Sequence, residues 1–154
     1  SNVFLKGGEV FIAKLNHNKD QSYFENFSNR SIVGILGYHY GFADFNSNEK
    51  YLKERFDISL VNSPQTIINQ VLGDKADIGV VTISYLKKQL NAIPGYQSQL
   101  LISDKIDQEY QHTILVREGH SEPSLDEINQ LLDKISRNGS LERLLNKYGI
   151  KPLE

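Results

Sequence analysis

Short apolar, β-branched runs alternate with segments of helical periodicity along most of the chain, and this alternation is the feature that most limits its fold. The run Ser31–Leu36 has the length and composition of a strand that is covered on both faces, and Ile58–Val61 and Ala76–Thr82 are expected to be further strands. Helical patterns separate them, at Asn48–Phe56 and after Ser63. This order predicts an α/β protein with an open mixed sheet and helices on both faces of the sheet.

Two of the expected helices carry signals at their ends. Ser63 is placed to cap a helix that begins at Pro64, where the missing N–H of proline costs nothing, and Gly73 ends that helix. Further along the chain, Ser124 and Glu127 form the S-x-x-E pattern of a capping box. We therefore expect well-defined helices to begin at these two positions.

Shorter patterns predict the remaining elements. We expect strands at Glu9–Leu15, Leu100–Ser103 and His112–Arg117, with a short helix at Ser84–Leu90. The helix that follows Ser124 is expected to end at Asn138-Gly139, and a last helix is expected to be capped by Ser140 and ended by Gly149.

Composition excludes several classes of protein. The 154 residues include no cysteine, so thiolate nucleophiles, disulfide frameworks and cysteine-bound zinc or iron–sulfur sites are ruled out. The net charge is −2 and no basic cluster is longer than Lys87-Lys88, which disfavours nucleic-acid binding. No apolar run approaches the roughly 18 residues that span a bilayer. The chain opens on Ser1-Asn2 without a signal peptide, so we expect a processed chain or an expressed fragment.

No catalytic, metal-binding or cofactor-binding motif stands out. The sequence lacks a nucleophile elbow, a phosphate-binding loop and a zinc-binding H-E-x-x-H motif. Asp44, Asn46 and Asn48 match the start of a calcium loop, but Glu49 and Arg55 stand where that loop needs glycine and glutamate. Asp104 and Asp107 are expected to lie in a solvated loop. We therefore expect no enzyme, no metal and no cofactor.

The loop Gly37–Gly41 is the strongest candidate for a binding site. It follows a predicted strand, so it is expected to present free backbone N–H groups at the carboxyl edge of the sheet, where open α/β sheets bind ligands. Tyr38, His39 and Tyr40 add two phenols and an imidazole, which suit stacking and hydrogen bonding. In the alternative interpretation, one tyrosine fills the core and the other covers the edge of the sheet.

The order of several motifs resembles that of the bacterial extracellular solute-binding proteins of family 3, the amino-acid-receptor type. The motifs cover nearly the whole chain: Phe11–Leu15, Ser31–Tyr38, Gly73–Thr82, His112–Gly119, Leu125–Asn129, Asn138–Leu141 and Lys147–Gly149. The resemblance implies one lobe of a type 2 periplasmic binding protein, which is the second lobe followed by C-terminal helices.

The resemblance also implies a division of the chain. Residues 1–29 would be the first hinge strand and a linker, residues 30–118 the second lobe with the return hinge strand, and residues 119–154 C-terminal helices that pack on a missing first lobe. The hinge strands would lie near Ala13 and Val116. The apolar face of the first C-terminal helix would then be partly uncovered unless the chain forms a homodimer. That face consists of Leu125, Ile128, Leu131, Leu132 and Ile135.

Site residues follow from the resemblance position by position. The ligand would meet Gly37, Tyr38, His39 and Tyr40 in the loop after the first strand of the lobe. Amino-acid receptors of this family hold the ligand's ammonium with an acid that corresponds here to Thr82, which carries no charge. An unpaired ammonium in a closed cleft is costly, and this departure disfavours an ordinary α-amino acid as the ligand.

The function implied is that of a periplasmic or extracytoplasmic solute-binding protein that binds a small polar ligand, with an amino-acid-like ligand as one candidate, for a membrane permease of the ABC type. Two alternatives use the same fold. One is a ligand-sensing domain of a membrane signalling protein. The other is a dehydratase or lyase, for which His39 is the single candidate acid or base.

Overall fold

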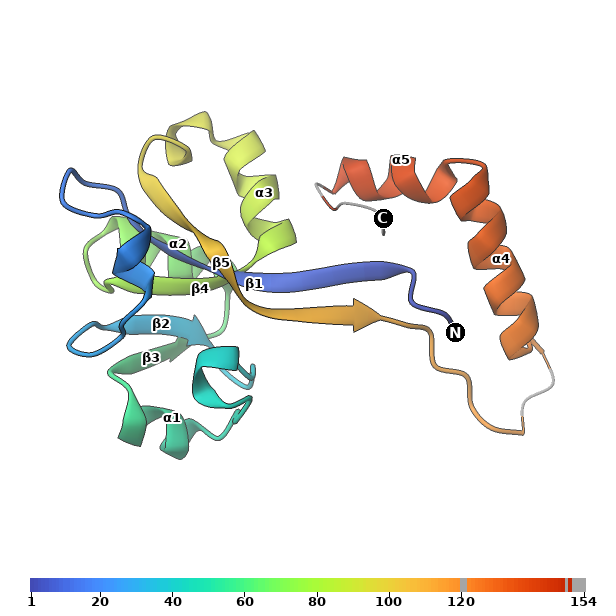
Figure 1. Cartoon of the computed structure of the whole chain (residues 1–154), viewed down its shortest axis with the longest axis horizontal. Helices are drawn as coiled ribbons and strands as arrows, with labels where there is room; N and C mark the ends of the chain where they lie inside the picture. The colour runs from blue at the N-terminus through green and yellow to red at the C-terminus, as the bar shows by residue number, and fades with distance from the viewer. Residues whose placement is uncertain (120–121, 149, 151–154) are drawn as a thin grey trace. The chain divides into compact units, whose positions relative to one another are not determined.

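Five strands form one mixed sheet in the order β3-β2-β4-β1-β5 (Figure 1). The computed structural model describes residues 1–119, 122–148 and 150. It divides into two compact units, residues 8–108 and residues 1–7 with 109–154. The elements of the described residues are β1 (Leu5–Lys14), β2 (Ile32–Ile35), α1 (Glu49–Arg55), β3 (Ile58–Val61), α2 (Pro64–Leu72), β4 (Ile78–Thr82), α3 (Ile83–Ala92), β5 (Leu100–His112), α4 (Leu125–Arg137) and α5 (Ser140–Lys147).

The centre of the sheet is parallel and one side of it is antiparallel. Strand β2 runs parallel to β3 and to β4, with Ile32 opposite both Ile58 and Ile78. Strand β1 runs antiparallel to β4, and Glu9 lies opposite Thr82. The carboxyl ends of β2 and β4 therefore lie at the same edge of the sheet as the beginning of β1.

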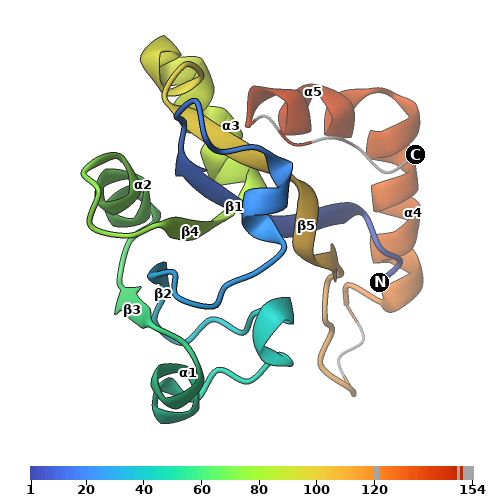
Figure 2. The same cartoon turned by 60° about the vertical axis from the view of Figure 1, so that its left-hand side comes forward.

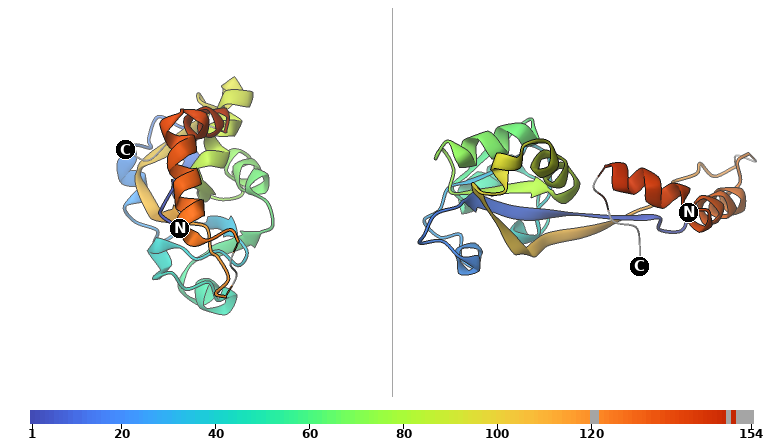
Figure 3. Two further views of the ribbon diagram at one scale, coloured as in Figure 1. Left: turned by 90° about the vertical axis from the view of Figure 1, so that its right-hand side faces the viewer. Right: turned by 90° about the horizontal axis from the view of Figure 1, so that it is seen from above.

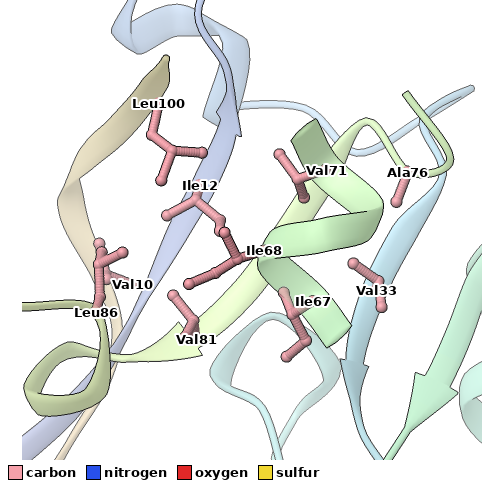
Figure 4. Packing of buried hydrophobic residues seen from close by; sticks show 10 residues of the cluster. All are labelled: Val10, Ile12, Val33, Ile67, Ile68, Val71, Ala76, Val81, Leu86 and Leu100. Atoms are coloured by element: carbon pink, nitrogen blue, oxygen red, sulfur yellow. The ribbon is translucent and has the colours of Figure 1, made fainter. Parts of the chain in front are cut away.

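Helices cover both faces of the sheet, as the sequence predicts. Helix α2 begins and ends as expected: Ser63 accepts a hydrogen bond from the N–H of Thr66, Pro64 occupies the first turn and Gly73 caps the end. Its apolar stripe packs on one face of the sheet (Figure 4), in a cluster of Val10, Ile12, Val33, Ile67, Ile68, Val71, Ala76, Val81, Leu86 and Leu100. Figure 2 shows α2 and α1 on opposite sides of β3.

The second face of the sheet carries a core rich in aromatic side chains. Phe11 packs against Phe24 and Phe27, and Phe42 contacts both Tyr40 and Phe56. Leu52 of α1 is fully buried in the same cluster. Phe11 and Ile12 are neighbours in β1 and belong to different clusters, so this strand contributes side chains to the cores on both faces of the sheet.

The predicted end of the sheet was wrong. A strand at His112–Arg117 is not formed, and β5 is instead one continuous strand that ends at His112 (Figure 3). It pairs with β1 over its length: Leu15 N–H donates to Gln99 O just before β5 begins, and Phe4 N–H donates to His112 O at its polar end. An edge strand with one solvated face does not need an apolar run.

The C-terminal helices α4 and α5 begin where sequence signals place them, with one correction. The capping box of Ser124 and Glu127 is formed in full. Ser140 is the first residue of α5 rather than its cap, because Gly139 occupies the cap position with a φ of 73°. The expected stop at Gly149 lies outside the described residues. None of the described residues of α4 is buried, and Leu131 is 58% exposed.

Candidate functional site

The candidate site lies at the edge of the sheet where β2 and β4 end. Three segments meet there within residues 8–108: the loop that follows β2, Thr82 at the end of β4, and the beginning of β1. Residues of β5 complete the arrangement through hydrogen bonds to the loop. This is the edge at which the sequence predicts a ligand.

The first half of the loop is open to solvent. Gly37 has a φ of 81°, a backbone conformation that glycine adopts without strain, and an added Cβ there would meet nothing within 4 Å. Tyr38 is 43% exposed and His39 is exposed. The N–H groups of Gly37 and His39 have no acceptor within the described part of the chain, whereas that of Tyr38 donates to Ile35 O. Two backbone donors are thus free to meet a ligand, and the rings of Tyr38 and His39 are exposed beside them, although Nδ1 of His39 is bonded to Gln108.

Tyr40 faces the opposite way, into the core. Its side chain is 0% exposed and stacks on Phe42. The hydroxyl accepts a hydrogen bond from Ile35 N–H and lies 3.2 Å from Ile35 O. Burial raises the pKa of the Tyr40 phenol, although its hydrogen bond to Ile35 opposes the shift. The alternative interpretation, in which one tyrosine fills the core, is therefore confirmed for Tyr40. This residue can offer a ligand only its backbone groups.

The side chain of Asp107, from β5, binds the second half of the loop. Its carboxylate accepts hydrogen bonds from the N–H groups of Gly41 and Phe42, at 2.7 and 2.8 Å. Burial raises the pKa of Asp107, while those two hydrogen bonds and Lys105 lower it. The expectation of free N–H groups is therefore wrong for Gly41, because an internal carboxylate already takes that place. The expectation of a loop is also wrong for both Asp104 and Asp107, which lie in β5; Asp104 is exposed there, whereas Asp107 is half-buried.

A buried carboxylate lies at the same edge of the sheet. Glu9 is 2% exposed and accepts a hydrogen bond from the side-chain amide of Gln108. That amide nitrogen also donates to His39 O at 2.7 Å, and the amide oxygen of Gln108 lies 3.0 Å from Nδ1 of His39. Because an amide oxygen can only accept, Nδ1 of His39 carries the proton. Glu9, Gln108 and His39 thus form one chain of hydrogen bonds.

Burial also shifts the titration of Glu9. Desolvation raises the pKa of its carboxyl and Asp107 adds to the rise, whereas Gln108 and His39 oppose it. The strand pairing sets Glu9 directly opposite Thr82, so the two side chains emerge on the same face of the sheet. Thr82 carries no charge, but a carboxylate does lie beside it, on the neighbouring strand. The Thr82 hydroxyl makes no capping bond to α3 and is half-buried.

Sequence reasoning missed Glu9, Asp107 and Gln108. Glu9 had one signal, since it is a carboxylate at the start of an otherwise apolar strand. Asp107 and Gln108 had none, because their roles depend on contacts with residues 65 to 99 positions away.

Other candidate features of the sequence are explained locally. The side chain of Asn46 accepts a hydrogen bond from Asn48 N–H just ahead of α1, and the side chain of Asn48 caps that helix by accepting one from Tyr51 N–H. No group of three or more metal-binding side chains occurs among the described residues. Hollows on the surfaces of α4 and α1 are each lined, among the described residues, by a single helix and its cap.

The chain matches known proteins by structure but not by sequence. No family model and no curated protein matches the sequence. Solved structures do match. They include a binding component of an ABC transporter from Wolinella succinogenes, complexed with lysine, at 17% identity and a TM-score of 0.68 over 94% of this chain. The GluR0 ligand-binding core from Nostoc punctiforme, in complex with L-glutamate, matches at 18% identity and a TM-score of 0.67 over 96%.

A third match is the L-cystine solute receptor of Neisseria gonorrhoeae, at 17% identity and a TM-score of 0.64 over 98% of this chain. The chain has the fold of one lobe of a type 2 periplasmic binding protein. It spans 60% to 63% of the length of these three proteins. The candidate site lies in the part of the fold that this chain contains.

Proposed function

We propose that this chain is the ligand-binding lobe of an extracytoplasmic solute-binding protein that delivers a small polar ligand to a membrane permease of the ABC type. The observation that carries the proposal is the open loop at the carboxyl edge of the sheet. There, the free N–H groups of Gly37 and His39, the exposed ring of Tyr38 and the hydroxyl of Thr82 lie at one edge. The shared fold supports the same function, because the matched structures include proteins described with bound lysine, arginine and glutamate.

The proposed architecture uses β1 and β5 as the two hinge strands. The return hinge strand expected near Val116 is not formed there, because β5 ends at His112. Both strands pass from residues 8–108 into the smaller unit, so the chain crosses between the units at residues 7–8 and 108–109. We assign residues 1–29 to the first hinge strand and a linker, residues 30–118 to the lobe with its return strand, and residues 119–154 to helices that pack on a further lobe. Within the described residues, no helix is long and apolar enough to cross a membrane.

The contact set that we propose comprises Gly37, Tyr38, His39 and Thr82, with Tyr40 contributing through its backbone. Catalysis is not part of the proposal. One ring nitrogen of His39 is bonded to Gln108, and no carboxylate of the described residues is hydrogen-bonded to the ring. One match is described as an ancestral amino-acid-binding protein and a precursor of cyclohexadienyl dehydratase, so the His39→Ala variant is a useful test of any turnover.

A sensing role is the second candidate. The GluR0 match is described as a ligand-binding core, so the fold alone does not separate delivery of a ligand from signalling. Binding at the loop is common to both functions.

The test is a titration of the ¹⁵N-labelled chain with L-arginine, L-lysine, L-glutamate and L-cystine. We expect at least one of them to shift the amide resonances of residues 37–39 and 82–83. The Tyr38→Ala variant should weaken that binding, and Tyr148→Ala, which removes a tyrosine that is 48% exposed in the smaller unit, should not. If none of the four shifts these amides, the proposed function is wrong.

A further inference from the structure

The orientation of the Gln108 side-chain amide is set by two oxygen atoms. Its nitrogen donates to the carboxylate of Glu9 and to His39 O, the latter at 2.7 Å. Both of these oxygens accept hydrogen bonds, so an amide turned the other way would bring its own oxygen against two further acceptors. The amide oxygen must therefore face Nδ1 of His39, which lies 3.0 Å away.

That orientation determines which nitrogen of the His39 ring carries the proton. Because the amide oxygen only accepts, the proton of the neutral imidazole is on Nδ1 and Nε2 keeps its lone pair. Nε2 has no hydrogen-bond partner within the described residues, and His39 is exposed. An edge-on contact with the ring of Phe45, with 6.1 Å between the ring centroids, also holds the imidazole in place. The loop therefore presents a hydrogen-bond acceptor whose direction the protein sets.

The loop thus offers a ligand both hydrogen-bond donors and an acceptor. The N–H groups of Gly37 and His39 donate, and Nε2 of His39 accepts. A carboxylate has no hydrogen to give, so one of its oxygens would face the lone pair of Nε2 unfavourably. A hydroxyl must accept and donate through one atom, whereas the ring separates Nε2 from the backbone of the loop. A primary carboxamide accepts at its oxygen and donates at its nitrogen, so it matches both kinds of group at two separate positions.

Resting on the proposed function, we infer that this loop binds a neutral carboxamide group of the ligand, and that Gln108 is the positioning residue that determines this preference. The carboxamide oxygen accepts from the free N–H groups of the loop, and its nitrogen donates to Nε2 of His39. Gln108 is buried and does not meet the ligand. It acts by holding the His39 ring in the tautomer that leaves Nε2 with a free lone pair.

The tautomer is tested first, on the chain without a ligand. Ring ¹⁵N chemical shifts distinguish a protonated imidazole nitrogen from an unprotonated one, and we expect Nδ1 of His39 to be protonated at about pH 8, where an ordinary imidazole is neutral. Gln108→Met keeps the length of the side chain but removes the amide, so His39 should populate both tautomers. Gln111→Met, the same substitution at an exposed position of β5, should leave the His39 shifts unchanged. A proton on Nε2 of the wild-type chain, or an unchanged tautomer in Gln108→Met, would overturn the inference.

The preference for an amide is tested with two probes that share one head group. L-glutamine carries a side-chain carboxamide, whereas L-glutamate γ-methyl ester carries an uncharged ester that accepts but does not donate. Dissociation constants are measured by amide shifts at residues 37–39 and 82–83. We expect the wild-type chain to bind L-glutamine about tenfold more tightly, which is the effect of one hydrogen bond, and L-glutamine alone to shift the Nε2 resonance of His39. Gln108→Met should reduce the ratio of the two affinities towards one, and Gln111→Met should not.

His39→Phe gives the same test at an exposed position if Gln108→Met does not fold, because it keeps a ring but removes the acceptor. Equal affinities of the wild-type chain for the two probes, or a ratio that these variants leave unchanged, would show that the inference is wrong while ligand binding at the loop stands. The same conclusion follows if one of the four amino acids tested above shifts these amides and L-glutamine does not. If neither probe and none of the four amino acids shifts them, the proposed function fails together with the inference.

Discussion

The hydroxyl of Tyr40 bonds to the backbone of Ile35, as a residue of a neighbouring strand would. It accepts from the N–H of Ile35 and lies within reach of the carbonyl of the same residue. Gly34 makes room for this ring, since a Cβ at that position would lie 2.7 Å from the hydroxyl. One buried side chain therefore fixes where β2 ends and where the exposed loop begins.

Removing that hydroxyl should destabilise the chain. The Tyr40→Phe variant leaves a buried N–H without its partner, and we expect the free energy of unfolding to fall by about 1–3 kcal/mol in urea denaturation. Tyr38→Phe removes an exposed hydroxyl from the same loop and should change it by less than about 0.5 kcal/mol. Equal effects of the two substitutions would contradict the structural role of Tyr40.

Glu9 should make stability depend on pH in a defined direction. Burial raises the pKa of Glu9 in the folded chain above its ordinary value of 4.5, so the folded state binds the proton more tightly than the unfolded state does. The stabilising effect is complete below that ordinary value and is lost as the pH rises through the folded pKa. Glu9→Gln mimics the protonated group, and we expect it to have the higher urea midpoint at pH 7.

Below pH 4.5 the midpoints of Glu9→Gln and the wild type should converge. Asp107 and His39, the titratable groups nearest Glu9, are unchanged in this comparison. A difference in midpoint that is the same at both pH values would show that charge is not its cause.

At the scale of elements, β5 anchors the loop that follows β2 to the sheet. Asp107 accepts hydrogen bonds from the N–H groups at the start of the short helical turn Gly41–Ala43. The next residue of β5, Gln108, donates to the carbonyl oxygen of His39. The approach is close, because a Cβ added at Gly41 would lie 2.2 Å from Asp107 O. The shape of the loop therefore depends on a strand that is about 65 residues away in sequence.

We expect Asp107→Ala to lower the free energy of unfolding by about 2 kcal/mol, because it leaves two N–H groups without their charged acceptor. The amide resonances of residues 39–42 should broaden or move. Asp104→Ala, at an exposed position of the same strand, serves as the control. If the two variants unfold at the same urea concentration, Asp107 does not anchor the loop.

Elements with local causes were predictable from the sequence, and those with distant causes were not. Ser63, Pro64 and Gly73 define α2 through contacts within a few residues, and the Ser124 capping box does the same for α4. The polar half of β5 is a strand because β1 pairs with it, which no local pattern records. The candidate site divides in the same way. The position of the loop directly after β2 was predictable from the sequence, whereas the bond between Glu9 and Gln108 was not, because it joins residues 99 positions apart.

At the scale of the whole molecule, the chain contains two units of very different burial. Residues 8–108 hold two buried clusters, whereas Leu145 is the one buried apolar side chain among the described residues of α4 and α5. Leu125 and Leu131 are each about half exposed on α4, and Ile128, Leu132 and Ile135 are half-buried. A helix with so little buried apolar surface depends mainly on its cap and on local pairs.

Hydrogen exchange should therefore differ sharply along the chain. We expect the amides of α4 to exchange at least about a hundredfold faster than those of α2, whose apolar stripe is fully buried. Protection of α4 that equals that of α2 at low protein concentration would contradict this account. Protection that rises with concentration would instead show that a second copy of the chain covers the α4 face.

The central claim is that a ligand binds at the edge of the sheet where β2 and β4 end. Intermolecular nuclear Overhauser effects between the chain and L-arginine test it most directly, because they report contacts between named protons. We predict contacts from the ligand to the rings of Tyr38 and His39 and to the methyl group of Thr82. Contacts confined to α4 and α5, or none to these three residues, would contradict the account.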